Sequence, residues 1–172
     1  MNLQSDDFDL FALARGFAQD RATLDAAWKA LQREAHPDKF AAQGAAAQRL
    51  AMQWSVRINE AYQRLKDPIR RAAYLCELAG FPIAAHQNTA MPATFLLRQM
   101  EWHEALDDAG SADALDALAA QVRDQQDAML SQCAQQIDVV KDYPAAVATV
   151  RALMFIDKFG QDVRARQHAL DA

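Results

Sequence analysis

The sequence has few of the residues that interrupt regular structure. Glycine and proline occur only five times each in 172 residues, whereas average usage is roughly 7% and 5%. So few turn-forming residues in an alanine-rich chain predict a small number of long elements. This favours helices over the many short strands of a sandwich or barrel. We therefore expect an all-α protein.

Cysteine is also scarce. Cys76 and Cys133 are the only two, and they do not form a C-x-x-C pair. The usual signatures of a dithiol redox site and of a zinc knuckle are therefore missing. A single cysteine among the apolar positions of a helix is usually a small buried hydrophobic side chain, and we expect this for both.

No segment has the features of a targeting or membrane sequence. The first nine residues contain three aspartates and no basic or apolar leader. No apolar run approaches the roughly 20 residues that span a bilayer. The formal net charge of −5 disfavours nucleic acid or anionic lipid as the main partner. We expect a cytoplasmic protein with no nucleic-acid and no membrane partner.

The common catalytic signatures are missing as well. The sequence has no H-E-x-x-H or G-x-S-x-G motif, and its glycines do not cluster into a phosphate-binding loop. His86, His103 and His168 are scattered along the chain. We expect no metal, no cofactor, no small-molecule substrate and no enzymatic activity.

Apolar spacing and helix-terminating residues divide the chain into helices. An N-cap at Asp20 or Thr23 and a stop at Pro37 bound one helix, and Asp67 caps another, which Gly80 ends. The apolar positions at helical spacing elsewhere include Leu50, Trp54 and Val140. We expect domains at 1–80 and 92–172, joined by a linker at 81–91. The predicted helices are 20–36, about 48–66, 68–79, 92–106, about 112–142 and about 145–170, and the last three form an antiparallel bundle.

The acidic charge belongs almost wholly to the second of these domains. Residues 1–80 contain 11 basic and 10 acidic side chains, a balance of +1. Residues 81–172 contain 7 basic and 13 acidic side chains, a balance of −6. The two halves therefore favour partners of different charge.

The tripeptide His36-Pro37-Asp38, followed by Lys39 and Phe40, interrupts two amphipathic helices. Proline fixes the backbone there, and we expect the His36 and Asp38 side chains to diverge, one on each side. Such a loop suits recognition of an arginine or a backbone group on a partner. The structural alternative is a plain loop with a capping aspartate. A catalytic histidine–aspartate pair is disfavoured because no nucleophile is nearby.

These residues resemble those of a known family. The helix with Trp28 and Arg33, HPDKF at 36–40 and the segment INEAYQRLKDPIRRAAYL resemble a J domain. DPIRRAAYLCELAGF (67–81), FLLRQMEWHEALDD (95–108) and VRALMFIDKF (150–159) narrow the resemblance to the HscB family of co-chaperones in iron–sulfur cluster assembly. Over residues 6–170, it implies an L-shaped molecule with a J domain and a three-helix bundle.

The resemblance implies a DnaK-type ATPase chaperone (HscA) as one partner, whose ATP hydrolysis the loop would stimulate. His36, Pro37 and Asp38 would make the essential contact, with Lys29, Arg33 and Lys39 guiding association. Lys29 and Arg33 lie four residues apart and share a helix face, and charges at such a rim mostly steer encounter. An ordinary solvated face is the alternative for each.

The resemblance also implies an iron–sulfur scaffold protein (IscU) as a second partner. Its site would be an acidic and apolar face of one helix. Leu97, Glu101, Glu104 and Asp108 step by four, three and four and so form one stripe, with Leu96 and Met100 beside it. Acidic residues among large apolar ones favour a partner surface, and bundle core is the alternative for the apolar members. The residues are Leu96, Leu97, Met100, Glu101, Glu104 and Asp108, with Phe155 from the last helix.

The sequence departs from the family pattern at a few positions of this face. Trp102 and His103 stand where the family more often has aliphatic and basic or polar residues, and Asp108 is shorter than the expected glutamate. Three other functions stay open: a J protein with a different client, a small hydrolase using His36 and Asp38, and a structural helical adaptor.

Overall fold

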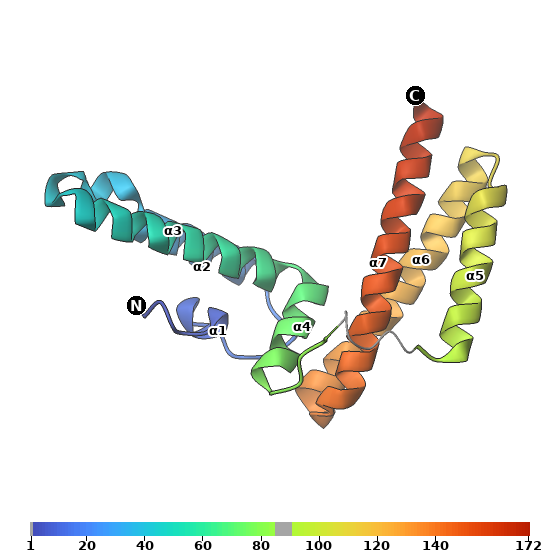
Figure 1. Cartoon of the computed structure of the whole chain (residues 1–172), viewed down its shortest axis with the longest axis horizontal. Helices are drawn as coiled ribbons and strands as arrows, with labels where there is room; N and C mark the ends of the chain where they lie inside the picture. The colour runs from blue at the N-terminus through green and yellow to red at the C-terminus, as the bar shows by residue number, and fades with distance from the viewer. Residues whose placement is uncertain (1, 85–90) are drawn as a thin grey trace. The chain divides into compact units, whose positions relative to one another are not determined.

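The computed structural model describes residues 2–84 and 91–172, and all the elements in these ranges are helical (Figure 1). The prediction of an all-α protein is therefore confirmed. The chain divides into two compact units, Met1–Leu75 and Cys76–Ala172. This division falls within a helix, a few residues before the domain end at residue 80 that the sequence predicted.

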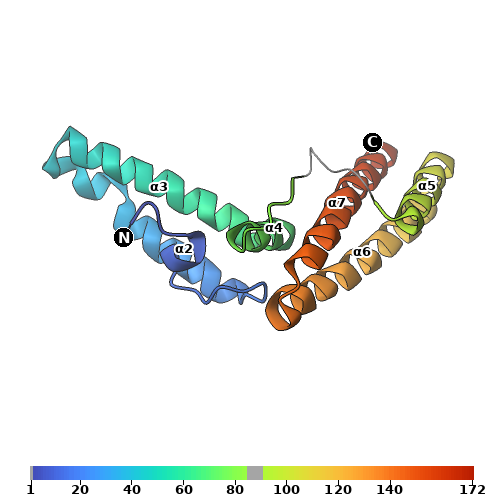
Figure 2. The ribbon, with the colours of Figure 1, turned by 60° about the horizontal axis from the view of Figure 1, so that its bottom comes forward.

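The first unit is built around a helical hairpin. Helices α2 (Arg21–Ala35) and α3 (Ala45–Lys66) run antiparallel and are joined by a short 3-10 helix, η1 (Pro37–Gln43) (Figures 1 and 2). A single turn, α1 (Asp7–Leu10), precedes them and α4 (Pro68–Leu78) follows. The hairpin has its core between the two long helices, from buried side chains that include Leu24, Ala51, Ile58, Ala61 and Leu65.

The ends of these helices are set locally, as the sequence predicted. The Asp20 carboxylate accepts hydrogen bonds from the Thr23 amide at 2.9 Å and its hydroxyl at 2.6 Å. Asp67 caps α4 by accepting from the amide of Ile69 at 2.9 Å. Gly80 follows α4 with a φ of +90°, and the Phe81 amide donates to the Cys76 carbonyl at 2.8 Å, which is the Schellman end that glycine favours.

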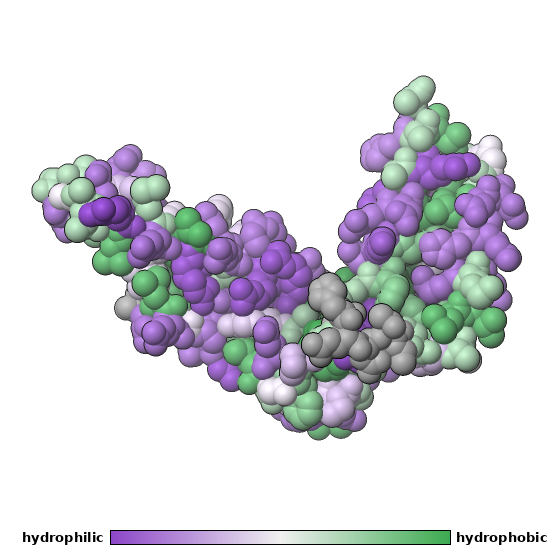
Figure 3. Space-filling view, viewed as in Figure 1, coloured by the Kyte–Doolittle hydropathy of each residue, from purple (hydrophilic) through white to green (hydrophobic). Residues whose placement is uncertain are grey.

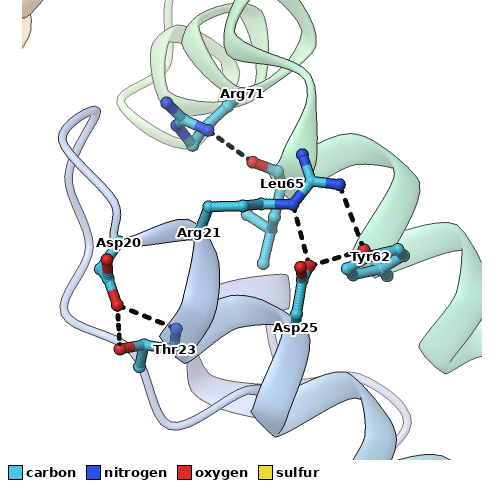
Figure 4. A network of polar contacts seen from close by, with 7 residues as sticks. All are labelled: Asp20, Arg21, Thr23, Asp25, Tyr62, Leu65 and Arg71. Carbon is cyan, nitrogen blue, oxygen red and sulfur yellow. Dashed lines mark hydrogen bonds and ion pairs between the residues drawn. The ribbon is translucent and has the colours of Figure 1, made fainter.

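Polar contacts fix how α2 and α3 lie against one another (Figure 4). The Tyr62 hydroxyl donates to Asp25 at 2.6 Å, and Arg21 donates to the same carboxylate at 2.9 Å. The Tyr62 ring also stacks on Trp28, with centroids 4.7 Å apart. Because these bonds need particular atoms opposite one another, they specify the register of the hairpin and hence the position of its connecting loop.

A buried carboxylate joins α1 to this hairpin. Asp7 is fully buried, and its oxygens lie 2.7 Å from Arg57 Nη1 and 3.4 Å from Arg64 Nε. Neither contact has hydrogen-bond geometry, so the attraction is that of an ion pair. The Asp7 amide donates to the Tyr74 hydroxyl at 3.0 Å, which brings α4 to the same point.

The second unit contains an up-down-up bundle. Its helices are α5 (Ala93–Asp108), α6 (Ala112–Ala134) and α7 (Tyr143–Asp171) (Figure 1). The α5–α7 contacts pair Phe95 with Phe155 and Trp102 with Phe159. The pairs ascend in both helices, so α5 and α7 run parallel and α6 antiparallel to both. A buried cluster of Trp102, Leu118, Val122, Ile156, Phe159 and Val163 holds them together.

The end of α6 differs from the regular helix that the sequence predicted to about residue 142. A π-helical turn, η2 (Gln135–Val140), follows α6, and Lys141 then takes a left-handed conformation with φ 61°. Each π turn inserts one residue and so rotates later side chains away from the original stripe. Val140, which the pattern placed among the apolar positions, is therefore exposed.

Both cysteines are free and completely buried, which confirms the prediction that they are small hydrophobic side chains. Burial raises the pKa of the Cys76 thiol to about 11 and that of Cys133 to about 12. The thiolate forms are therefore absent at neutral pH, and both sulfur atoms are unreactive as nucleophiles.

Candidate functional site

The candidate sites lie at the end of the first unit's hairpin and on the surface of the bundle. At the hairpin, His36 has an extended backbone, with φ −63° and ψ 126°. This is the conformation forced on a residue before proline, and it ends α2. Pro37 opens η1, and the Lys39 amide donates to the His36 carbonyl at 3.0 Å. The loop is thus a defined 3-10 turn with His36, Asp38 and Lys39 exposed.

The expectation that His36 and Asp38 diverge is wrong. The His36 Nδ1 atom lies 3.3 Å from the Asp38 amide, from which it accepts a hydrogen bond, and 3.6 Å from the Asp38 carboxylate. The tight turn after Pro37 brings both groups back over the ring. In the neutral ring that accepts from this amide, the proton is on Nε2. No hydroxyl or thiol of residues 2–84 and 91–172 hydrogen-bonds to either side chain, so a nucleophile partner is missing from this part of the chain.

The basic residues of α2 line one side of the hairpin. Lys29 and Arg33 are exposed and border a shallow groove whose other walls are Trp28, Gln32 and Asn59. With Lys39 they make three exposed cations close to the loop, and none forms an ion pair with any residue that the structure describes. Their charges are therefore available to an acidic partner.

Two residues of this groove were missed by the sequence reasoning. Gln32 and Asn59 hold its walls together, because Asn59 Oδ1 accepts from Gln32 Nε2 at 2.7 Å and from Trp28 Nε1 at 3.0 Å. The signal available in the sequence is the spacing of Trp28 and Gln32, four residues apart and thus on one helix face. It does not identify the partner on α3, which depends on the register of the hairpin.

The second site is formed by α5, which has two opposite apolar faces. At 100° per residue, Phe95, Trp102 and Leu106 lie on one side of the helix, against the core cluster. The predicted stripe lies on the other side, within an arc of about 140°. Both faces contain large apolar residues, and the tertiary contacts show that the face without acidic residues is the one that packs in the core.

The alternative that the predicted apolar residues belong to the bundle core is wrong. Leu96, Leu97, Met100 and Phe155 have exposed fractions between 46% and 61%. Phe155 is held beside α5 by an edge-to-face contact with Phe95, with centroids 6.2 Å apart. The structure therefore places four large apolar side chains of α5 and α7 in contact with solvent, and such surfaces mark interaction sites.

The acidic members of this surface are also accessible. Glu101, Glu104 and Asp108 are exposed, and none of them forms an ion pair within the described ranges. Trp102 is a core residue stacked on Phe159 at 5.5 Å, whereas His103 is exposed and touches the Phe159 ring edge-on at 4.9 Å. Of these two departures from the family pattern, only His103 borders the surface.

The described residues provide neither a metal site nor a membrane-spanning helix. In residues 2–84 and 91–172, no group of three or more histidine, cysteine, aspartate or glutamate side chains is placed to hold a metal ion. In the same ranges, none of the helices combines the length and the apolar character needed to cross a lipid bilayer.

Comparison with known proteins gives consistent matches over the whole chain. A family profile described as the HSCB C-terminal oligomerisation domain matches residues 91–164. The co-chaperone protein HscB homolog of Burkholderia multivorans is 48% identical, with 99% of both chains covered.

Solved structures show the same similarity. Chaperone HscB from Vibrio cholerae superposes with a TM-score of 0.85 and 34% identity, covering 96% of this chain and 99% of the other. The human co-chaperone protein HscB gives a TM-score of 0.91 at 25% identity, covering 96% of this chain and 83% of the other.

Proposed function

This chain belongs to the HscB family of co-chaperones, and from that premise we propose that it delivers an IscU-type iron–sulfur scaffold protein to a DnaK-type ATPase chaperone of the HscA kind. Its J domain stimulates ATP hydrolysis by the chaperone, and the hydrolysis promotes cluster transfer from the scaffold. The chain binds both partners and catalyses no reaction itself. We place this activity in the cytoplasm.

Contact with the ATPase is assigned to the loop at the end of the hairpin. His36, Pro37 and Asp38 are presented on a rigid turn, and Lys29, Arg33 and Lys39 add exposed positive charge along α2 and in the turn. An acidic surface on the ATPase would be attracted to these cations before the loop itself makes contact. The short-range contact then depends on His36 and Asp38, whose mutual distance the turn fixes.

Binding of the scaffold is assigned to the exposed face of α5 with Phe155. The observation that carries the proposal is that Leu96, Leu97 and Met100 are exposed on the same side of α5 as three unpaired carboxylates, with the exposed Phe155 of α7 next to that helix. The apolar side chains supply binding energy when water leaves. The carboxylates select a partner with basic groups around an apolar centre.

Two sites on one chain raise the concentration of the scaffold near the ATPase. Once one partner is bound, the second encounter occurs at an effective concentration set by the connection between the sites. This is how a protein with no catalytic residues of its own would accelerate a reaction of its partners.

The variant His36→Gln tests the role of the loop. It keeps a polar side chain of similar size but loses the imidazole, so we expect stimulation of the chaperone's ATPase to be abolished while scaffold binding stays unchanged. Stimulation equal to that of the unmodified protein would remove the J-protein assignment. It would leave the structural-adaptor alternative.

The double variant Glu101→Gln, Glu104→Gln tests the scaffold surface by isothermal titration calorimetry with the purified scaffold. Removing two charges is expected to weaken binding by about tenfold. The control is Asp127→Asn, Asp162→Asn, which removes two exposed charges from α6 and α7. Equal affinities for the two double variants would remove this face of α5 as the scaffold site. A J protein with a different client would be favoured if the unmodified protein stimulates the ATPase but shows no binding to the scaffold.

A further inference from the structure

The first unit has an apolar pocket immediately beside the HPD loop. It is lined by Ala35 of α2, Phe40 of η1, and Ala47, Leu50, Ala51 and Trp54 of α3, with Glu34 and Gln43 at its edge. Figure 3 shows hydrophobic side chains near this end of the hairpin, among hydrophilic ones. Phe40 completes the HPDKF segment, and the proposed function gives it no role.

The pocket exists because η1 does not fully cover the start of α3. Leu50 and Trp54 belong to one apolar stripe at helical spacing, but Leu50 has an exposed fraction of 49% and Trp54 is only half-buried. Ala47 and Ala51 are small, so they leave a hollow between Phe40 and the two larger side chains. Leaving this apolar area in water has a cost that a partner's side chain would offset.

The size and lining of the pocket limit what it can bind. Its volume is about 230 Å³, below the roughly 300–1,000 Å³ of pockets that enclose small molecules. Aromatic and aliphatic side chains form most of its wall. It therefore has room for one aliphatic side chain of leucine size. Its mostly apolar wall suits such a side chain, which needs no hydrogen-bond partner.

The position of the pocket identifies the partner that supplies this side chain. Phe40 follows Asp38 by two residues and Glu34 precedes His36 by two, so a protein that covers the loop also reaches the pocket. Arg33 and Lys39 lie beside these residues in the chain and are exposed.

We propose that this pocket receives one aliphatic side chain of the ATPase chaperone, set within an acidic surface, when the chaperone engages the HPD loop. The inference rests on the proposed function. The pocket adds an apolar anchor to a contact otherwise made of polar groups. Its occupation contributes to affinity rather than to the signal for hydrolysis.

Two variants with opposite chemistry test the pocket. Leu50→Glu places a charge at its wall, and Ala47→Leu keeps the wall apolar but fills the space. Since burying one aliphatic side chain contributes to affinity, each should raise the co-chaperone concentration for half-maximal ATPase stimulation by at least about tenfold. Maximal stimulation should change little.

The control is Met52→Glu. Met52 is on the same helix and 58% exposed, but it lies about 200° around the helix from Leu50 and outside the pocket. We expect its half-maximal concentration to stay within about twofold of the unmodified protein. Circular dichroism melts of all three variants check that the hairpin is folded.

The outcomes separate this inference from the proposed function. If His36→Gln still stimulates the ATPase, the proposed function itself fails. If His36→Gln is inactive but Leu50→Glu and Ala47→Leu match Met52→Glu, only the pocket inference is overturned. The pocket inference is also overturned if the half-maximal concentration rises for Leu50→Glu but not for Ala47→Leu. It is overturned as well if light scattering shows self-association that Leu50→Glu abolishes.

Discussion

Different interactions hold the helices together within each of the two units of this molecule. In the first, arginines add directional contacts to an apolar core. Arg57 and Arg64 pair with buried Asp7, Arg64 also lies 4.5 Å from the Tyr74 ring centroid, and Arg71 donates to the Phe17 carbonyl at 2.7 Å. In the second, the core consists of apolar and aromatic side chains, with the Trp102–Phe159 stack at its centre.

This difference matches what each unit has to position. The contacts of the first unit are directional, so they fix the register of α2 against α3 and with it the turn that presents His36 and Asp38. The packing of the second unit is non-directional and uses only one side of α5. Its opposite side therefore keeps large apolar residues free for a partner.

The largest effect that separates the units is expected from Phe159→Ala. Phe159 is 2% exposed, and truncating a buried phenylalanine lowers the free energy of unfolding by about 3–5 kcal/mol. Hydrogen exchange reports on the stability of the two units separately, and it should show the lower stability only in residues 91–172. Phe155→Ala, four residues away but exposed, is the control and should change stability by less than about 1 kcal/mol. Equal losses would contradict the two-sided description of α5.

Asp7→Asn should weaken the first unit by about 3 kcal/mol, because it leaves two arginines without their buried counter-ion. The change is read from hydrogen exchange over α2 and α3. Asp9→Asn, at an exposed position of the same short helix, is the control. A loss equal to that of the control would mean that the buried ion pair does not hold α1 in place.

Glycine substitutions should have opposite signs in the two units. A Cβ on Gly160, in the interior of α7, would meet Val122 at 3.5 Å, an ordinary van der Waals contact. Gly160→Ala is therefore expected to raise the free energy of unfolding by about 0.5–1 kcal/mol. Gly44→Ala should lower it, because the φ of +97° at the start of α3 suits glycine. Thermal melts in which the melting temperatures of Gly160→Ala and Gly44→Ala shift in the same direction would contradict this.

The smallest expected effect concerns acid. The hydrogen bond from the Tyr62 hydroxyl, with that from Arg21, lowers the pKa of Asp25 below its ordinary value. The resulting stabilisation is present above the unfolded pKa of about 3.9 and is lost as pH falls through the folded pKa.

Asp25→Asn should therefore reduce the urea midpoint of the first unit at pH 7, and the difference from the unmodified protein should shrink below about pH 4. Glu60→Gln, an exposed carboxylate on α3, is the control and should show no such convergence. A constant difference at both pH values would exclude the Asp25 carboxylate as its cause.

Helix ends were predictable because their causes are local. Asp20, Asp67 and Gly80 act on amides and carbonyls within a few residues of themselves, so the sequence identifies them without knowledge of the fold. The exposure of Leu50 and Val140 and the His36–Asp38 contact do not have such local causes. Val140 and the His36–Asp38 contact follow a π turn and a 3-10 turn, which rotate side chains away from regular helical periodicity, whereas Leu50 is exposed because η1 leaves the start of α3 uncovered.

The sequence by itself determined the helical class, the helix ends near caps and prolines, and the two surfaces that carry the candidate residues. The acidic residues of α5 already indicated which of its faces meets solvent, and the tertiary structure supplied the cause, because Phe155 and Phe159 of α7 contact the opposite face. Only the tertiary structure decided that Phe40 borders a pocket. Periodicity records which residues share a face, whereas burial depends on what another element places opposite that face.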